Sequence, residues 1–397
     1  MERRTVVDQK PVQILFALLR SAICGTKLDE AERVCCTPEL LGDLLKLSVK
    51  HDLIHLLVYA LMQNDLLPQN HLELENYVLK AVYRYERMKY EFEALCAVLE
   101  KAQIPFLPLK GSVIRKYYPE AWMRTSCDID VLVREEDVDR AMDMLTTERG
   151  YTHHAKTAHD VSMHTPSGVN VELHHDLIED GRINGAAEVL ASVWKGATLR
   201  EGFSYWYEMT EEMFCLYHIV HMAKHLVEGG CGIRPFLDLW ILKRNVNLAS
   251  DKLTELLALS RLTDTYKELS KTVQVWFEDG IHDSVTRAME EYILRGGVYG
   301  SHDNAAAVKA AAGEGRSKSL LKLIFLSPKN LAMIYPRMER YPILYPFYQV
   351  KRWFRIFNKT KRDKVKRLTD ARGAVTKEQI SSTADLLHHL GLDDQKK

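Results

Sequence analysis

The feature that most constrains the fold is the run at 127–133, CDIDVLV, in which apolar residues alternate with Asp128 and Asp130. Successive side chains of a β-strand point to opposite faces, so the run predicts a strand with one apolar face and both aspartates on the other. Two carboxylates this close repel one another unless a cation lies between them. The pair therefore indicates a site for one or two divalent metal ions, and the competing interpretation is a solvated strand end.

Two further segments place polar groups next to this strand. The run 169–175, VNVELHH, alternates in the same way and puts Glu172 on its polar side as a third carboxylate. The apolar run 104–109 ends in Lys110, Gly111 and Ser112 and passes into a predicted helix at 113–118. A glycine and a hydroxyl at a strand-to-helix turn can bind phosphate oxygens through backbone N–H groups at the positive end of the helix.

The order of elements places Glu172 beside the aspartates if the sheet is continuous. A helix follows the aspartate strand, opens at acidic residues 135–137 and ends at Gly150, the position of a helix C-cap. Three antiparallel strands are then predicted, at 151–155, 161–164 and 169–174, with a hairpin turn at 166–168. Histidines around these strands are expected at exposed strand or turn positions: His153, His154, His159 and His164.

Helical patterns precede and follow this core. Residues 11–104 have apolar side chains at helical spacing, and Lys50, His51, Asp52 and His55 within them are expected on a solvated face. Later, a predicted helix at 210–227 carries a stripe of polar residues: His218, His221, Lys224 and His225. The absence of a glutamate in an HExxH arrangement disfavours a zinc-protease site. A stripe facing a cleft and a structural stripe hydrogen-bonded to Asp238 or to backbone both remain open.

Composition limits the class of protein. The 397 residues allow two or three domains, and the formal net charge of zero excludes a globally charged polyanion-binding protein. Seven scattered cysteines form no CxxC pair, and no apolar run reaches the length of a spanning helix. A cytoplasmic location is expected.

The C-terminal part changes character twice. Residues 301–315 are rich in alanine and glycine and are expected to form a flexible loop. In 316–368 basic residues greatly outnumber the two acids, Glu339 and Asp363, and aromatic and aliphatic residues lie between them. This basic amphipathic segment could contact an anionic membrane surface, bind RNA or another polyanion, or pack onto the helical region, and packing is favoured.

These motifs together resemble the bacterial family called uncharacterised nucleotidyltransferases, within the superfamily of DNA polymerase β-like nucleotidyltransferases. The resemblance rests on these positions: Leu109–Ser112, Arg115, Tyr117–Pro119, Arg124, Asp128–Asp130, Gly150, Tyr151, Val171–His174, His221, Lys224, His225 and Asp238. Two features depart from the superfamily pattern: the segment between Gly111 and Asp128 is longer, and Cys127 stands where a serine is usual. Ser126 could supply that hydroxyl.

The resemblance implies an α+β fold, with a mixed nucleotidyltransferase sheet between N-terminal and C-terminal helical regions. The expected division is 1–104 (helical), 105–209 (α/β core), 210–300 (helical, lining the cleft), 301–315 (loop) and 316–397 (basic amphipathic region). The implied activity is Mg²⁺-dependent transfer of a nucleoside monophosphate from a nucleoside triphosphate, with ATP expected, to an acceptor hydroxyl. The acceptor could be a small molecule, a sugar or a protein.

The resemblance also assigns roles to residues of this chain. Asp128, Asp130 and Glu172 would be the catalytic metal ligands, and Glu172 would also orient or deprotonate the acceptor. Phosphate-binding residues would be Lys110, Gly111, Ser112, Arg115 and Arg124. The wall of the pocket would include His174, His221, Lys224, His225 and Asp238. The alternative is a regulatory module with the same fold that binds a nucleotide without turnover.

Overall fold

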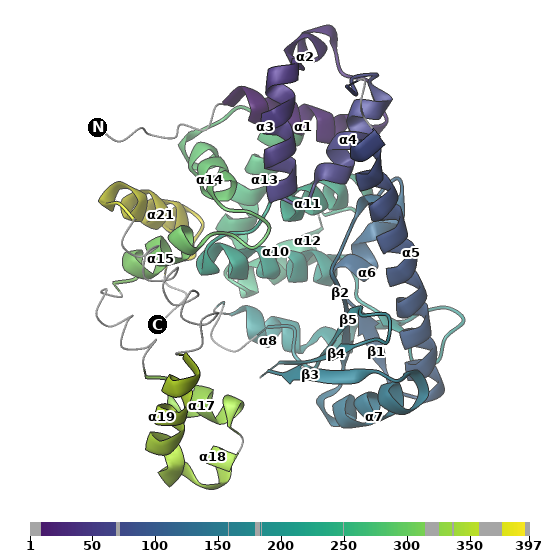
Figure 1. Cartoon of the computed structure of the whole chain (residues 1–397), viewed down its shortest axis with the longest axis vertical. Helices are drawn as coiled ribbons and strands as arrows, with labels where there is room; N and C mark the ends of the chain where they lie inside the picture. The colour runs from purple at the N-terminus through teal and green to yellow at the C-terminus, as the bar shows by residue number, and fades with distance from the viewer. Residues whose placement is uncertain are drawn as a thin grey trace.

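The computed structural model describes most of the chain as a mixed sheet flanked by helices (Figure 1). The described residues are 9–68, 72–157, 159–178, 183, 185–248, 250–313, 325–335, 337–356 and 375–393. Helices both precede and follow the sheet in the chain. The α+β class expected from the sequence is confirmed.

The main sheet has the strand order β1-β2-β5-β4-β3. Its strands are β1 (Phe106–Pro108), β2 (Asp128–Val133), β3 (Thr152–Lys156), β4 (Asp160–His164) and β5 (Asn170–His174). Strand β2 pairs in parallel with β5, and all other neighbours pair antiparallel. The register sets Asp128 opposite Asn170 and Asp130 opposite Glu172. Glu172 therefore lies on the strand next to the aspartates, as the order of elements predicts.

One face of the sheet is covered by two helices. Ile129, Val131 and Val133 are fully buried in a cluster with apolar residues of α5 (Leu72–Lys101) and α7 (Val138–Arg149). Helix α7 ends at Gly150, whose φ of 68° lies in the left-handed region that favours glycine. Burial of this apolar face leaves the aspartate face of β2 directed to the other side of the sheet.

The aspartate face looks toward a second core, which joins the helices before the sheet to those after it. Before the sheet lie α1 (Gln9–Cys24), α2 (Glu30–Cys35), α3 (Pro38–Lys50) and α4 (Ile54–Gln63). After it lie α8 (Ala186–Ala191), α9 (Val193–Gly196), α10 (Glu211–Glu228), α11 (Arg234–Asn245), α12 (Asp251–Leu259), α13 (Thr263–Phe277) and α14 (Ser284–Arg295). Phe16 of α1 stacks on Trp276 of α13 with ring centroids 4.6 Å apart. Leu107 and Leu132 join the sheet to this core.

Short elements connect these layers. They are α6 (Gly111–Ile114), the 3₁₀ turns η1 (Arg115–Tyr117), η2 (Ala121–Met123) and η3 (Glu135–Asp137), and a small hairpin of β6 (Thr198–Leu199) and β7 (Tyr207–Glu208). The single helix predicted at 113–118 is thus divided between α6 and η1, and it begins at Gly111.

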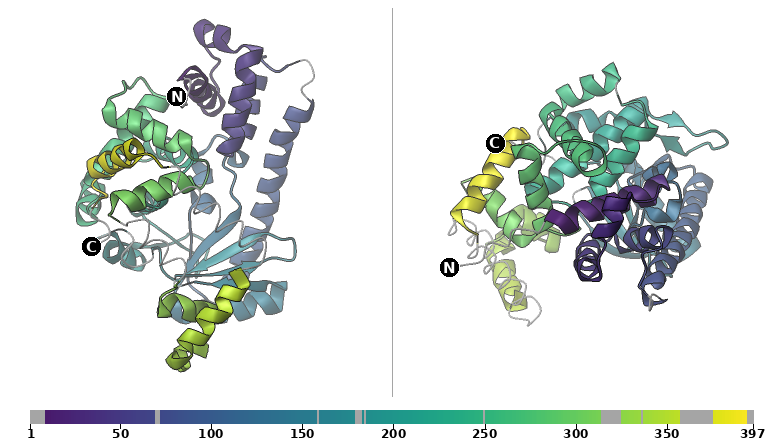
Figure 2. Two further views of the ribbon diagram at one scale, coloured as in Figure 1. Left: turned by 60° about the vertical axis from the view of Figure 1, so that its left-hand side comes forward. Right: turned by 90° about the horizontal axis from the view of Figure 1, so that it is seen from above.

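The expectation of a flexible loop at 301–315 is wrong for most of that segment, because His302–Ala311 form helix α15. The alanines that suggested a loop have the highest helix propensity of all residues. Ser301 caps the helix, and the buried side chain of Asn304 donates to the backbone oxygen of Tyr292. Helix α15 packs against the C-terminal helix α21 (Lys377–His389), as both views in Figure 2 show. Residues 314 and 315 lie outside the described part.

Part of the basic amphipathic segment forms helices that pack on one another. They are α17 (Pro328–Ile334), α18 (Arg337–Arg340), the 3₁₀ turn η4 (Pro342–Leu344) and α19 (Tyr345–Ile356). Leu331, Met338 and Tyr348 form their small apolar centre. Among the helices described, none combines the length and the apolar content needed to cross a bilayer.

Candidate active site

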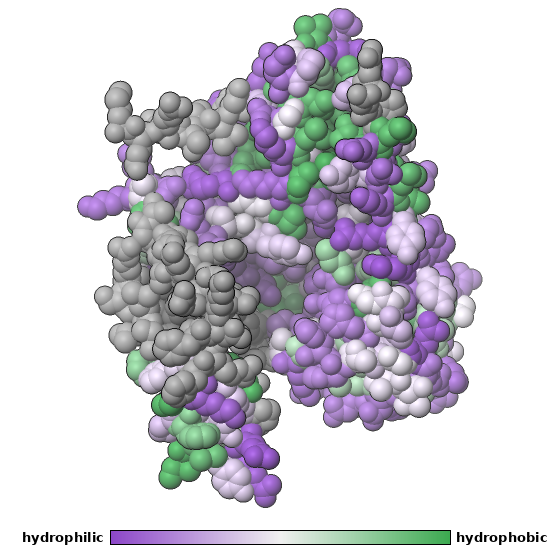
Figure 3. All heavy atoms as spheres, in the orientation of Figure 1, coloured by the Kyte–Doolittle hydropathy of each residue, from purple (hydrophilic) through white to green (hydrophobic). Residues whose placement is uncertain are grey.

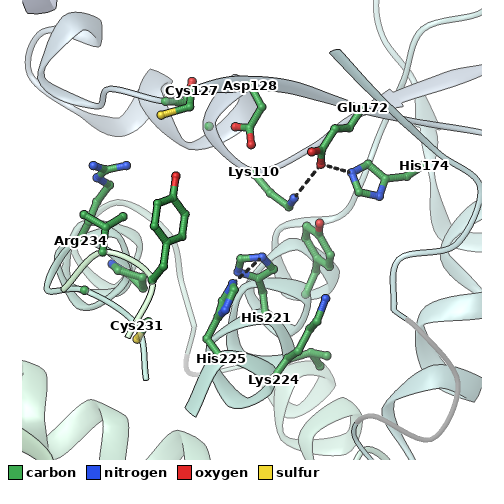
Figure 4. A pocket seen from close by; sticks show the side chains of 18 of the residues that line it. Lys110, Cys127, Asp128, Glu172, His174, His221, Lys224, His225, Cys231 and Arg234 are labelled. Carbon is green, nitrogen blue, oxygen red and sulfur yellow. Dashed lines mark hydrogen bonds and ion pairs between the residues drawn. The ribbon is translucent and has the colours of Figure 1, made fainter. Parts of the chain in front are cut away.

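A cavity of about 340 Å³ lies between the aspartate face of the sheet and helix α10 (Figure 4). Its lining includes Lys110, Asp128, Glu172 and His174 from the sheet side, and Tyr217, His221, Lys224 and His225 from α10. Residues that lie between 43 and 115 positions apart in the sequence thus face one another across one space.

Asp130, Glu172 and His174 form the acidic centre of the site. The parallel register makes Asp130 and Glu172 cross-strand neighbours, and His174 follows two residues later on the same face. His174 Nε2 lies 2.9 Å from Asp130 Oδ1 and 3.4 Å from Glu172 Oε2. One ligand atom from each of the three residues lies within 4.8 Å of the others, so the group could hold a metal ion. Asp128 lines the same cavity, two residues before Asp130.

Lys110 supplies the positive charge at this centre. Its Nζ lies 2.6 Å from Asp130 Oδ1 and 4.0 Å from Glu172 Oε2. Lys110 has a φ of 44°, which a residue other than glycine adopts only at a cost. The turn between β1 and α6 therefore directs an ammonium group to the acids, between which a bound cation would otherwise be expected.

Charge interactions separate the pKa values of the two aspartates. Burial by itself would raise the pKa of Asp130, but the charge of Lys110 and the hydrogen bond from His174 hold it well below its ordinary value. Burial and the nearby charge of Asp130 raise the pKa of Asp128 to about 6. Burial would lower the pKa of His174, but its hydrogen bonds to Asp130 and Glu172 raise it. The raised pKa favours a protonated His174 ring, in which Nε2–H donates to Asp130.

The predicted phosphate-binding turn is only partly directed into this cavity. Gly111 lines it, whereas Ser112 and Arg115 line a second cavity of about 490 Å³. Ser126 takes the place nearest to Gly111, because a Cβ atom added at that glycine would lie 3.2 Å from Ser126 Cβ. Arg115 reaches the site indirectly, through a hydrogen bond of 2.8 Å from Nη2 to Ser126 Oγ.

Arg124 and Asp238 form a buried ion pair at the edge of the site. Arg124 Nε lies 2.8 and 3.0 Å from the two carboxylate oxygens of Asp238, and the Tyr118 hydroxyl donates to the same carboxylate at 2.6 Å. Burial would raise the pKa of Asp238, but the charge of Arg124 lowers it. Arg124 lines the cavity, whereas Asp238 lies behind it and joins the connection that precedes β2 to helix α11.

Helix α10 supplies the opposite wall of the cavity. Thr210 caps its start and Gly229 ends it, so the helix matches the span of 210–227 expected from the sequence to within a residue. His221 Nε2 and His225 Nε2 lie 3.3 Å apart, and Figure 4 shows both rings facing the sheet side. Burial lowers the pKa of His225 to about 4 and holds the pKa of His221 well below its ordinary value, which favours neutral rings at pH 7. The third histidine of the stripe, His218, instead bonds the backbone oxygen of Pro235.

Sequence analysis missed several residues that line or support the cavity. Tyr217 precedes His221 by one helical turn, and this spacing was the one signal that could have found it. Two of the four residues expected on a solvated face are buried instead: His51 has no exposed surface, and His55 Nε2 bonds the backbone oxygen of Met123 at 2.9 Å. Lys50 is exposed, as expected. Asp52 bonds Arg234 of α11. His55 and Asp52 thus contact residues 68 and 182 positions away, and local periodicity cannot indicate such contacts.

His159 is a further departure from the sequence-based expectation. It lines the cavity and, with Asp160 and His174, forms a second group whose ligand atoms lie within 4.8 Å of one another. The two groups share His174. The histidine expected at an exposed position therefore belongs to the margin of the acidic centre.

The architecture and the acidic centre together define a nucleotidyltransferase-like core: a mixed sheet with acids on adjacent strands, facing a helical wall. The chain matches the model of the family described as uncharacterised nucleotidyltransferase over residues 38–278. This match covers more than half of the chain, and the protein therefore belongs to that family. No curated protein and no solved structure matches the chain.

Proposed function

We propose that the protein transfers a nucleoside monophosphate from a nucleoside triphosphate, with ATP the expected donor, to an acceptor hydroxyl. The observation that carries this proposal is the register of two neighbouring parallel strands, which sets Asp130 beside Glu172, while Asp128 and Glu172 line one cavity. Family membership supports the reaction class. The acceptor belongs to one of three chemical classes: a small molecule, a sugar or a protein side chain.

The donor atoms of the acidic centre fit a magnesium ion. Mg²⁺ prefers carboxylate oxygens, and Asp130 and Glu172 of the acidic centre offer them. Asp128, two residues before Asp130 on the same strand, would supply a third carboxylate from the cavity lining. His174 would act behind them, since its hydrogen bond orients Asp130. When bound, the ion would supply positive charge for the phosphate oxygens that gain negative charge during transfer.

The remaining steps are assigned to groups of the chain. Lys110, Gly111 and Ser126 would bind the β- and γ-phosphates from the turn beside the acids. Glu172 would orient the acceptor hydroxyl and take its proton. The acceptor oxygen then bonds to the α-phosphorus, the bond from that phosphorus to the bridging oxygen breaks, and pyrophosphate leaves with the electron pair. Arg124, held in place by Asp238, would offset the charge of the departing pyrophosphate.

A second candidate, a regulatory module that binds a nucleotide without turnover, is favoured by the position of Lys110. Its ammonium already neutralises Asp130, the acid that a catalytic metal ion would need. In the enzyme, Lys110 would exchange its contact with Asp130 for a contact with a phosphate oxygen. In the regulatory module, Lys110 would keep its contact with Asp130.

Labelled nucleotides distinguish these functions. The protein is incubated with Mg²⁺, each α-³²P-labelled nucleoside triphosphate in turn, and cell extract as the source of acceptor. Transfer by wild type that is lost in Asp128→Asn/Asp130→Asn and kept in Asp143→Asn, an exposed control on α7, supports the enzyme. Binding of nucleotide without transfer supports the module. Absence of both binding and transfer would refute both functions.

A further inference from the structure

The C-terminal helical unit, defined here as the described residues of 325–356, lies outside the part of the chain that matches the family. It has its own apolar centre of Leu331, Met338 and Tyr348. Tyr345 and Gln349 of α19 both donate to the backbone oxygen of Leu326 and so close the unit on itself. The unit is therefore a separate packed group of short helices.

This unit leaves a large share of its apolar side chains in solvent. The exposed fraction is 87% for Ile343, 62% for Phe347 and 44% for Val350. Phe325, Ile334 and Tyr341 are exposed as well. Figure 3 shows apolar side chains gathered on the surface of the unit, at the lower left of the view. An apolar surface of this kind marks a contact site rather than a surface evolved for water alone.

The sequence segment 316–368, which contains this unit, has a strongly positive net charge, although the formal net charge of the whole chain is zero. Between residues 316 and 368 there are fifteen lysines and arginines and two acids, so the rest of the chain carries a matching excess of acids. On α19 itself, Lys351 and Arg352 directly follow Val350, and Phe347 lies one turn earlier. Basic and apolar groups are thus presented together from one short helix.

We propose that the C-terminal helical unit docks the protein on an anionic lipid bilayer. Ile343, Phe347 and Val350 would enter the boundary between headgroups and acyl chains, while Lys351 and Arg352 bind lipid phosphates. Helix α19 has 12 residues, which suits a helix lying in the interface rather than one crossing it. The acidic remainder of the chain would be repelled from the same surface, which orients the molecule with this unit toward the lipid.

RNA is the competing anionic partner, and the aliphatic half of the exposed apolar side chains, Ile343, Ile334 and Val350, favours a bilayer over it. RNA-binding surfaces combine cations with aromatic rings on which bases stack. The most exposed large apolar residue of this unit is Ile343, an aliphatic side chain that offers neither charge nor a stacking surface. A bilayer accommodates it directly.

Vesicle co-sedimentation of the full-length protein tests the proposal. The vesicles contain either phosphatidylcholine alone or phosphatidylcholine with 30% phosphatidylglycerol, in 0.1 M salt. We expect binding to the anionic vesicles to be at least about tenfold tighter than to the neutral ones and to weaken in 0.5 M salt. Ile343→Asp/Phe347→Asp and Lys351→Glu/Arg352→Glu should each weaken binding about tenfold or more.

The control is Ile281→Asp, because Ile281 is 91% exposed but lies between α13 and α14, outside the unit. It should bind anionic vesicles as wild type does. Far-UV circular dichroism and urea unfolding verify that each variant is folded. No binding of wild type to anionic vesicles, unchanged binding of the Ile343/Phe347 variant, or binding of single-stranded RNA in place of vesicles would each overturn the proposal. Loss of binding in Ile281→Asp would overturn it too, since the contact would then lie elsewhere.

Discussion

Asp128→Asn should make the metal-free protein more stable at neutral pH while abolishing nucleotidyl transfer. Burial and the charge of Asp130 raise the pKa of Asp128 from its ordinary value of 3.8 to about 6. A raised folded-state pKa means that the stability contributed by the protonated group is fully present below pH 3.8 and is lost as the pH rises through 6. Asparagine keeps the neutral form at every pH, so the loss is avoided.

The size of the effect follows from the pKa shift. A difference of about two pKa units corresponds to about 3 kcal/mol in the free energy of unfolding. Asp128 is partly exposed, and solvent screening reduces that figure. We therefore expect Asp128→Asn to raise the free energy of unfolding at pH 7.5 by about 1–3 kcal/mol, and the difference to disappear near pH 4.

Urea unfolding in EDTA at pH 7.5 and at pH 4 measures this difference, with Asp143→Asn as the exposed control. Addition of Mg²⁺ at pH 7.5 should stabilise wild type and the control but not Asp128→Asn, because the ion binds the folded state through the missing carboxylate. If Asp128→Asn is no more stable than wild type at pH 7.5, the repulsion between the two aspartates is not as described. If Mg²⁺ stabilises all three proteins equally, this aspartate is not a ligand.

Three further expectations follow from the site. The Mg²⁺ concentration at half-saturation, measured by thermal shift, should rise about tenfold for each pH unit below 6, because protons compete with the ion for Asp128. A half-saturating concentration that stays constant from pH 5 to 7.5 would contradict this. Asp238→Asn should lower the free energy of unfolding by about 3–5 kcal/mol, because it leaves the Arg124 charge buried without its partner. The control is Glu255→Gln, which breaks the exposed ion pair with Lys252 and should cost less than about 1 kcal/mol. Similar urea midpoints for the two variants would contradict the expectation. Ser126→Ala should raise the Kd for a nucleoside triphosphate about threefold to tenfold, as measured by calorimetry, because Ser126 lines the cavity. Ser112→Ala should leave the Kd unchanged, because Ser112 lines the second cavity. The reverse result would mean that Ser112 binds the phosphate.

The strands and the acids of the core could be predicted from the sequence because their signals are local. The period of two in 127–133 and 169–175 places apolar side chains on one face and acids on the other, whatever lies around them. The end of α7 at Gly150 and the start of α10 at Thr210 were also predictable, because caps depend on neighbouring backbone groups. To predict that Glu172 lies beside Asp130, only the order of the strands in the sheet was needed in addition to these local signals.

Two segments differ from the expectation because composition and polarity are weak signals of local structure and of burial. The alanines at 305–307 and 310–312, with glycines after them, suggest a loop, but alanine favours a helix and Ser301 caps its start. His51 and His55 are expected in solvent because they are polar, yet both are buried, and His51 lines the cavity. The polarity of one residue does not reveal which other elements cover it.

The sequence by itself determined which chemical groups the protein has at its centre: two alternating strands, three carboxylates and a glycine turn. Only the tertiary structure decided their partners. Lys110 contacts Asp130 across 20 positions, Arg124 pairs with Asp238 across 114, and Arg234 reaches Asp52 across 182. Such contacts arise when separate helices and strands bury their apolar faces against one another, and the packing that fixes them leaves no periodic trace in the chain.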